Sequence, residues 1–242
     1  MNTKNLGLLV IALLAGPVGA ETIVVGTPTS DNAIPFGGGS YALDGTEPAP
    51  ISEYQQVYDS GVFSGSETIK SLTFYCSAAY CGDSANAKSL STGDYQLFLS
   101  TTSAPVNGLS TDLFSNTGSN DSLVYSGDVP NATKLGQSDQ FTFSLSKSFF
   151  YDPTLGNLLL TVTVGNQGPA TFGLQADDSG SLTSRAYSTE SGNTGADSAG
   201  LVTGFGVAPT AAPEVDPASA ASGLALLFGS VAVLRGRRRV RA

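Results

Sequence analysis

The chain of 242 residues contains no histidine and no tryptophan, and it has only two cysteines. The absence of histidine excludes Ser–His–Asp and Cys–His triads and removes the side chain that most often acts as a general base near neutral pH. It also excludes most zinc and copper sites, since imidazole is a usual ligand of both metals. The sequence therefore predicts no catalytic residues, no metal site and no cofactor, and we expect the protein not to be an enzyme.

Carboxylates remain as catalytic groups, since two of them suffice for glycoside hydrolysis. No two acidic residues are marked as such a pair by their spacing. Asp177 and Asp178, followed by Ser179 and Gly180, offer oxygen ligands of the kind that calcium needs. The same residues are typical of a tight turn, and the turn is the favoured interpretation.

Positively charged side chains are scarce between the two ends of the chain. Residues 21–212 contain five Lys or Arg against eighteen Asp or Glu, which gives this part a net charge of about −13. Nucleic-acid binding is disfavoured, because phosphate contacts need clustered Lys and Arg. The acidic excess suits a protein that stays soluble outside the cell.

Long apolar segments are confined to the two ends. At the N-terminus, Lys4 precedes an apolar core at residues 6–15, and Val18 and Ala20 are small residues at the positions that signal peptidase requires. A run of about ten apolar residues is too short to span a bilayer. Residues 1–20 are therefore predicted to be a signal peptide that is cleaved after Ala20, which makes Glu21 the new N-terminus.

The C-terminal apolar segment is longer. Residues 218–234 are uncharged, and as a helix they would extend about 25 Å, slightly less than a typical hydrocarbon core of about 30 Å. They predict one transmembrane helix, followed by an Arg-rich tail at residues 235–242 that is expected to stay in the cytoplasm. The orienting arginines are Arg235, Arg237, Arg238, Arg239 and Arg241. These residues alone are compatible with a permanent single-pass anchor and with a temporary one.

A Pro/Ala linker at residues 208–217 joins the body of the chain to this helix. It ends in Pro213, Glu214, Val215, Asp216 and Pro217. A Pro-Glu motif, a short helix with small residues and a terminal Arg cluster, in this order, resemble the PEP-CTERM sorting tail of Gram-negative bacteria. The resemblance covers about the last thirty residues, and it departs from the family pattern at Val215, where the motif has a second proline.

The resemblance to PEP-CTERM proteins implies a route for the chain. In that family a membrane-embedded cysteine transpeptidase, exosortase, recognises the motif and removes the tail, and the protein then moves to the cell surface or the extracellular matrix. The implied partners are signal peptidase, an exosortase-like transpeptidase and, temporarily, the inner membrane. Residues 34–74 are also similar, more loosely, to the opening module of many PEP-CTERM ectodomains, which implies a β-sandwich without a known activity.

Alternating apolar residues predict strands throughout residues 21–207. In the segment 158–164, for example, Leu158, Leu160 and Val162 alternate with residues of the opposite face. Nine or ten antiparallel strands in one domain predict an all-β fold, a single β-sandwich of jelly-roll type, with a closed barrel as the alternative. The expected strands are residues 22–25, 55–63, 72–76, 95–99, 123–126, 141–146, 158–164, 171–175, 183–187 and 201–207, with turns at 117–121 and 190–195.

Cys76 and Cys81 are expected to form one disulfide, since a secreted chain with two cysteines most simply pairs them. The loop between them is short, so such a bond would contribute about 2 kcal/mol and act as a local staple. A reactive thiol or half of a metal site is the less favoured alternative, because no histidine is available to complete either.

These features predict a non-catalytic exported protein of the cell surface or extracellular matrix, whose body is a structural or adhesive module. The alternative is a carbohydrate-binding module for exopolysaccharide, in which some of the nine tyrosines would take the stacking role of the missing tryptophans. A carboxylate-dependent glycosidase is the third and least favoured hypothesis.

Overall fold

The computed structural model describes residues 21–32, 36, 51–77, 93–128, 140–166 and 173–208. The chain divides into two compact units, Met1–Pro209 and Thr210–Ala242, and all described residues belong to the first. The predicted signal peptide, the sorting motif, the predicted transmembrane helix and the Arg-rich tail lie outside the described residues. No helix in the described ranges is both long enough and apolar enough to cross a membrane.

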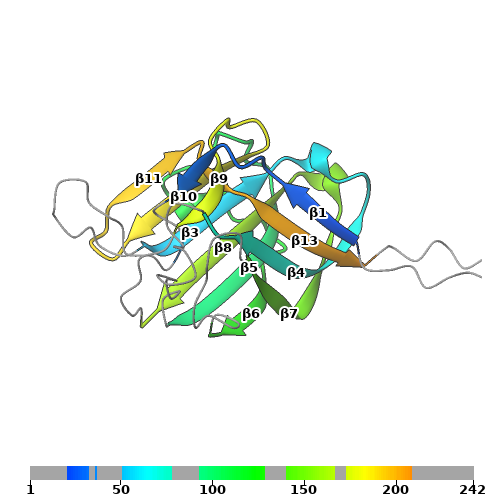
Figure 1. Cartoon of the computed structure of the whole chain (residues 1–242), viewed down its shortest axis with the longest axis horizontal. Helices are drawn as coiled ribbons and strands as arrows, with labels where there is room; N and C mark the ends of the chain where they lie inside the picture. Colours follow the sequence, from blue (N-terminus) through cyan, green and yellow to red (C-terminus); the bar gives the residue numbers. More distant parts are fainter. Residues whose placement is uncertain are drawn as a thin grey trace, which may run out of the picture. The chain divides into compact units, whose positions relative to one another are not determined.

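The described part of the chain is all-β and is built from antiparallel sheets (Figure 1). One sheet has four strands, in the order β1 (Glu21–Val25), β13 (Thr203–Ala208), β4 (Glu67–Tyr75) and β7 (Gln140–Tyr151). A second has six, in the order β11 (Thr194–Asp197), β10 (Thr183–Thr189), β3 (Ile51–Tyr58), β8 (Asn157–Gly165), β5 (Asp94–Thr102) and β6 (Ser122–Gly127). A small third sheet contains β12 (Gly200–Leu201), β9 (Leu174–Asp177) and β2 (Ser30–Asn32). The described residues also contain three short 3-10 turns. η1 (Ser60–Val62) follows β3, η2 (Leu113–Asn116) lies between β5 and β6, and η3 (Pro153–Leu155) follows β7.

The two larger sheets pack face to face through aromatic side chains. Phe205 of the four-stranded sheet meets Tyr58 of the six-stranded sheet edge-on, with ring centroids 4.9 Å apart. Phe36 lies 4.9 Å from the Phe74 ring of one sheet and 5.8 Å from the Tyr54 ring of the other. Edge-to-face contacts of this kind are favourable, and they join both sheets into one core of a sandwich-like arrangement.

The alternation predicted from the sequence is confirmed along β8, one of the two central strands of the six-stranded sheet. Leu158, Leu160 and Val162 are fully buried between the sheets, whereas Leu159 lies on the opposite face, in a second apolar cluster. Side chains of successive strand residues point to opposite faces, so every second position reaches the core.

Several predicted boundaries were wrong. β4 begins at Glu67 rather than at residue 72, and β7 extends to Tyr151 rather than to residue 146. The strand expected at residues 55–63 is β3, which begins at Ile51 and ends at Tyr58. It ends there because the Asp59 carboxylate accepts a hydrogen bond from the Gly61 N–H at 2.7 Å and starts the turn η1. The turn expected at residues 190–195 is shorter, since Thr194 already pairs with Ser188 and begins β11.

A loop at residues 103–121 covers the outer face of the six-stranded sheet. Its Leu113 belongs to the same apolar cluster as Val57 of β3. The buried Gln55 side chain fastens the loop: its Nε2 donates to the Leu113 carbonyl at 3.0 Å, and its Oε1 accepts from Asn116 Nδ2 at 2.8 Å. These bonds give the Leu113 carbonyl and the Asn116 side chain of the loop a buried partner on the sheet, as buried polar groups require.

Candidate functional site

The most unusual polar group of the described chain is an ion pair between two neighbouring strands. Arg185 of β10 is only 7% exposed and lies directly opposite Asp197 of β11. Arg185 Nε is 2.7 Å from Asp197 Oδ1, and Arg185 Nη2 is 2.9 Å from Asp197 Oδ2, so the contact is bidentate. The guanidinium also lies 5.4 Å from the centre of the Tyr187 ring.

The protonation of this pair follows from two opposing effects. Burial alone would lower the pKa of Arg185 and raise the pKa of Asp197. The hydrogen bonds and charges that the two groups share outweigh burial, so the pKa of Arg185 is raised and the pKa of Asp197 is lowered. Both groups are therefore charged at neutral pH.

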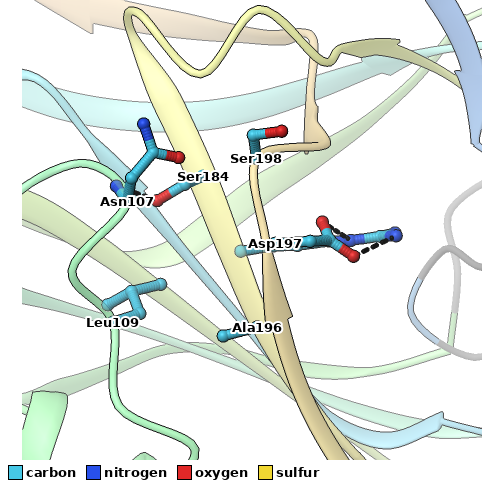
Figure 2. Close-up of a pocket in the computed structure, with 7 residues that line it drawn as sticks. Asn107, Leu109, Ser184, Ala196, Asp197 and Ser198 are labelled. Atoms are coloured by element: carbon cyan, nitrogen blue, oxygen red, sulfur yellow. Dashed lines mark hydrogen bonds and ion pairs between the residues drawn. The ribbon is translucent and has the colours of Figure 1, made fainter.

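A pocket of about 180 Å3 lies beside the ion pair (Figure 2). Figure 2 shows the Asp197 carboxylate turned away from Asn107 and Leu109, which lie on the other side of the pocket. The ion pair thus borders the pocket rather than projecting its charge into it. The lining residues are Asn107, Leu109, Ser184, Arg185, Ala196, Asp197 and Ser198.

The polar side chains around the pocket already have partners within the chain. Ser184 Oγ accepts from the Asn107 N–H at 2.7 Å, and Asn107 Nδ2 donates to the Gly180 carbonyl at 2.6 Å. Ser198 Oγ donates to the Asp178 carbonyl at 3.2 Å. Ligand pockets are usually larger, about 300–1,000 Å3. These contacts therefore fasten the loop 103–121 to β10 and to the turn before it, and they fasten the end of β11 to the same turn.

Asp177 is the last residue of β9 and Asp178 begins the turn that follows it, and their hydrogen bonds hold this turn. Asp177 accepts from the Thr27 N–H and the Ser179 N–H, both at 3.0 Å. Asp178 Oδ1 accepts from Thr29 Oγ1 at 2.5 Å. Burial would raise the pKa of Asp177, but its hydrogen bonds to Ser179 and Thr27 lower it. Within the described ranges, no three His, Cys, Asp or Glu residues are grouped as a metal site requires.

The described tyrosines do not form an exposed surface for sugar stacking. Those that are fully buried are Tyr54, Tyr58, Tyr95 and Tyr151, and those that are half-buried are Tyr75, Tyr125 and Tyr187. The exposed aromatic rings are phenylalanines that the sequence did not single out: Phe114 is 87% exposed and Phe150 is 59% exposed. They lie on η2 and β7, which belong to different layers of the sandwich. Single exposed apolar side chains are common on soluble proteins.

The remaining predicted site residues lie mostly outside the described residues. Cys76 follows β4, is fully buried and is disulfide-bonded, whereas its predicted partner Cys81 lies outside the described ranges. The same holds for the sorting motif at residues 213–217 and for the arginines of the tail. The Arg185–Asp197 pair was not predicted. The available signal was that Arg185, the single arginine of residues 21–212, occupies the same strand face as Thr183 and Tyr187.

The first and last strands of the body lie side by side. All five residues of β1 pair with β13, and Glu21 lies opposite Val207 (Figure 1). The Cα atoms of such antiparallel partners are about 4.5–5.5 Å apart. Both ends of the body therefore meet at one edge of the four-stranded sheet.

Comparison with models of known protein families finds no match to this sequence, and comparison with curated proteins finds none either.

Proposed function

We propose that the chain is a non-catalytic exported protein of the cell surface or extracellular matrix, sorted through its PEP-CTERM-like tail. The observation that carries the proposal is the pairing of β1 with β13. The ladder begins at Glu21, the first residue after the predicted signal peptide, and β13 ends at Ala208. Residues 209–212 separate it from the motif that starts at Pro213. Removal of both predicted export segments would leave every sheet of the described residues complete.

The polar contacts of the body support a structural or adhesive module. The carboxylates of Asp177, Asp178 and Asp197 hold turns or a buried guanidinium through internal hydrogen bonds. A glycosidase needs two carboxyl groups that face each other across a cleft open to substrate, about 5–10 Å apart. Carboxylates engaged in this way are poor candidates for that role.

The strand order supports a jelly-roll sandwich for this module. The eight strands concerned are, in chain order, β1, β3, β4, β5, β6, β7, β8 and β13. The first, eighth, third and sixth of them are neighbours in one sheet, and the second, seventh, fourth and fifth are neighbours in the other. Two Greek keys wound through two sheets give this order. In this interpretation β10 and β11 extend the second sheet beside β3.

The proposed maturation has four steps. Signal peptidase cleaves after Ala20, and Cys76 and Cys81 form their disulfide outside the cytoplasm. The helix at residues 218–234 holds the folded body at the inner membrane. An exosortase-like transpeptidase then cuts near residues 213–217, where two prolines favour the extended backbone that a protease binds, and the body moves to the surface or matrix.

Replacement of Glu214 tests the sorting proposal. The wild-type protein and the Glu214→Ala variant are expressed in the native host, fractionated and measured by intact mass. We expect the wild-type protein at the surface, without residues 1–20 and without the tail. We expect the Glu214→Ala protein in the inner membrane, with residues 235–242 still attached. Glu190→Ala, which removes an exposed acid from a turn of the body, is the matched control. Unchanged release of Glu214→Ala, or a wild-type protein that keeps its tail, contradicts the proposal.

The alternative function is exopolysaccharide binding, and among the tyrosines it would depend on Tyr41 and Tyr80, which lie outside the described residues. Pull-down of the exported protein with insoluble neutral polysaccharides, compared for wild type and Tyr41→Ala, tests this alternative. Binding that the variant loses would favour it over a purely structural role.

A further inference from the structure

We propose that β1 is an exchangeable arm through which one copy of the chain pairs with β13 of a second copy. The inference rests on the proposed function in one respect, because removal of residues 1–20 makes Glu21 the free end of the arm. It adds a partner, a second copy of this chain, and an interface, the edge of β13.

The arm is the least buried part of the four-stranded sheet. It is an edge strand with one neighbour, β13. Glu21, Thr22 and Val24 are exposed, Val24 by 53%, and Ile23 is half-buried, so Val25 alone is buried. Elements with little buried apolar surface open at a low free-energy cost, and edge strands readily pair with other chains.

A glycine separates the arm, residues 21–25, from the fixed part of the chain that follows it. Gly26 has a φ of 95°, a conformation that suits glycine best. From the next residue on, the chain is held to β9 and its turn: the Thr27 N–H donates to Asp177 Oδ2 at 3.0 Å, and the Thr29 N–H donates to the Ala176 carbonyl at 2.9 Å. Rotation about the Gly26 backbone can therefore release residues 21–25 while the rest of the sandwich stays folded.

The edge of β13 pairs with all five residues of the arm. Gly204 and Gly206 of β13 lie opposite Val24 and Thr22. A Cβ added at Gly204 would lie 3.5 Å from Cγ2 of Thr22, in van der Waals contact with it, and 2.7 Å from the Tyr75 hydroxyl of β4, so the arm and β4 both approach Gly204. A second copy offers the same five residues in the same register. The ladder between copies then has the same contacts as the ladder within one copy, and the concentration of the protein decides between them.

The order of export favours capture by a second copy. The arm leaves the membrane first, and its own β13 follows only after more than 170 residues. During this interval the arm has no intramolecular partner, whereas a neighbouring folded copy can expose its β13 edge whenever its own arm opens. The arm is about 17 Å long at 3.4 Å per residue, so exchange brings the two β13 edges close together. Reciprocal exchange gives a closed dimer, and successive one-way exchange gives a fibre.

Cysteine pairs between copies test the exchange. Thr22→Cys and Gly206→Cys are placed in two differently tagged full-length chains, both carrying Ser71→Ala, because a Cβ at Gly206 would lie 2.1 Å from Ser71 Oγ. The two chains are expressed together in the native host, and the exported protein is oxidised mildly and separated without reducing agent. We expect a covalent dimer that carries both tags, in which mass spectrometry finds a disulfide between position 22 of one chain and position 206 of the other.

The matched control pair lies in the middle of the six-stranded sheet. Gln96→Cys and Thr163→Cys are direct partners on β5 and β8, strands with neighbours on both sides, and we expect no link between copies. Links that form only when Thr22→Cys and Gly206→Cys are placed in the same chain overturn the inference. A dimer linked through position 22 of both copies also overturns it, because the arms would then pair edge to edge.

N-terminal sequencing of the same sample separates the two proposals. A chain that begins at Met1 overturns the proposed processing. A chain that begins at Glu21 and forms the link only within itself overturns the exchange alone.

Discussion

Replacement of Gln56 by leucine should destabilise the body strongly, because this side chain makes three hydrogen bonds, two of which join β3 to β12. It is fully buried; its Oε1 accepts from the Tyr54 hydroxyl at 2.6 Å and from the Leu201 N–H at 2.7 Å, and its Nε2 donates to the Leu201 carbonyl at 2.7 Å. Leucine has a similar size and no polar atom. The Leu201 carbonyl would keep its bond from Thr203 Oγ1. The Tyr54 hydroxyl and the Leu201 N–H would lose their bonds to Gln56 and keep only the contact that they make with each other.

The expected loss can be worked out from these two groups. Each buried group that loses a hydrogen bond to Gln56 costs about 1–3 kcal/mol, so two cost about 2–6 kcal/mol. The larger apolar area of leucine offsets about 1–2 kcal/mol. The midpoints of the two ranges leave a net loss of about 2.5 kcal/mol out of the 5–15 kcal/mol typical of a domain.

Urea unfolding of the exported protein, followed by circular dichroism and tyrosine fluorescence, measures this loss. Gln140→Leu makes the same replacement at an exposed position of β7 and should change the free energy of unfolding by less than about 0.5 kcal/mol. A loss below about 1 kcal/mol for Gln56→Leu, with an unchanged dependence on urea concentration, would refute the reasoning that the Gln56 bonds fasten the sheets.

Three further predictions concern other contacts of the sandwich. Asp197→Ala leaves Arg185 without its carboxylate, and because Asp197 is 41% exposed we expect a loss of about 1–3 kcal/mol, below the range for fully buried pairs. Folding lowers the pKa of Asp197, so the stabilisation by its charged carboxylate is present above the unfolded pKa near 4 and is lost as the pH falls through the lower, folded pKa. The urea midpoints of the wild type and the variant should therefore converge as the pH falls below about 4. Gly118→Ala places a Cβ 1.8 Å from the Thr101 carbonyl oxygen, and an unchanged melting temperature would contradict the expected strain of about 1–3 kcal/mol. Leu160→Ala opens a cavity in the core and should cost about 2–5 kcal/mol in urea unfolding; a loss under about 1 kcal/mol would mean that β8 is not central.

The sequence predicted strands best where burial is apolar on one face. In β8 every inward position is Leu or Val, so the alternation is visible without the structure. In β3 the inward and outward faces are both buried, and Gln55 and Gln56 occupy two of these positions. Polar residues are buried there because hydrogen-bond partners come from η2 and β12, which lie far away in the sequence. The boundaries of β3 were therefore not predictable from periodicity.

The polar contacts of the candidate site depend on pairing over long distances along the chain. The Asp177–Thr27 bond joins residues 150 positions apart, and no local pattern announces it. The Arg185–Asp197 pair depends on the register between β10 and β11. β11 has no apolar alternation because it is an edge strand with exposed residues, so a turn was predicted where its first residues lie.

The pairing of Glu21 with Val207 has a consequence for protein engineering. Since the two ends of the body are about 5 Å apart, residues 21–208 should be insertable as a cassette into a surface loop of an unrelated carrier, with linkers of only a few residues. The same adjacency permits a circular permutant, in which a short hairpin connects Ala208 to Glu21 and new termini open in the exposed turn at Glu190–Asn193. In that permutant β1 has no free end, so the strand is held permanently beside its own β13.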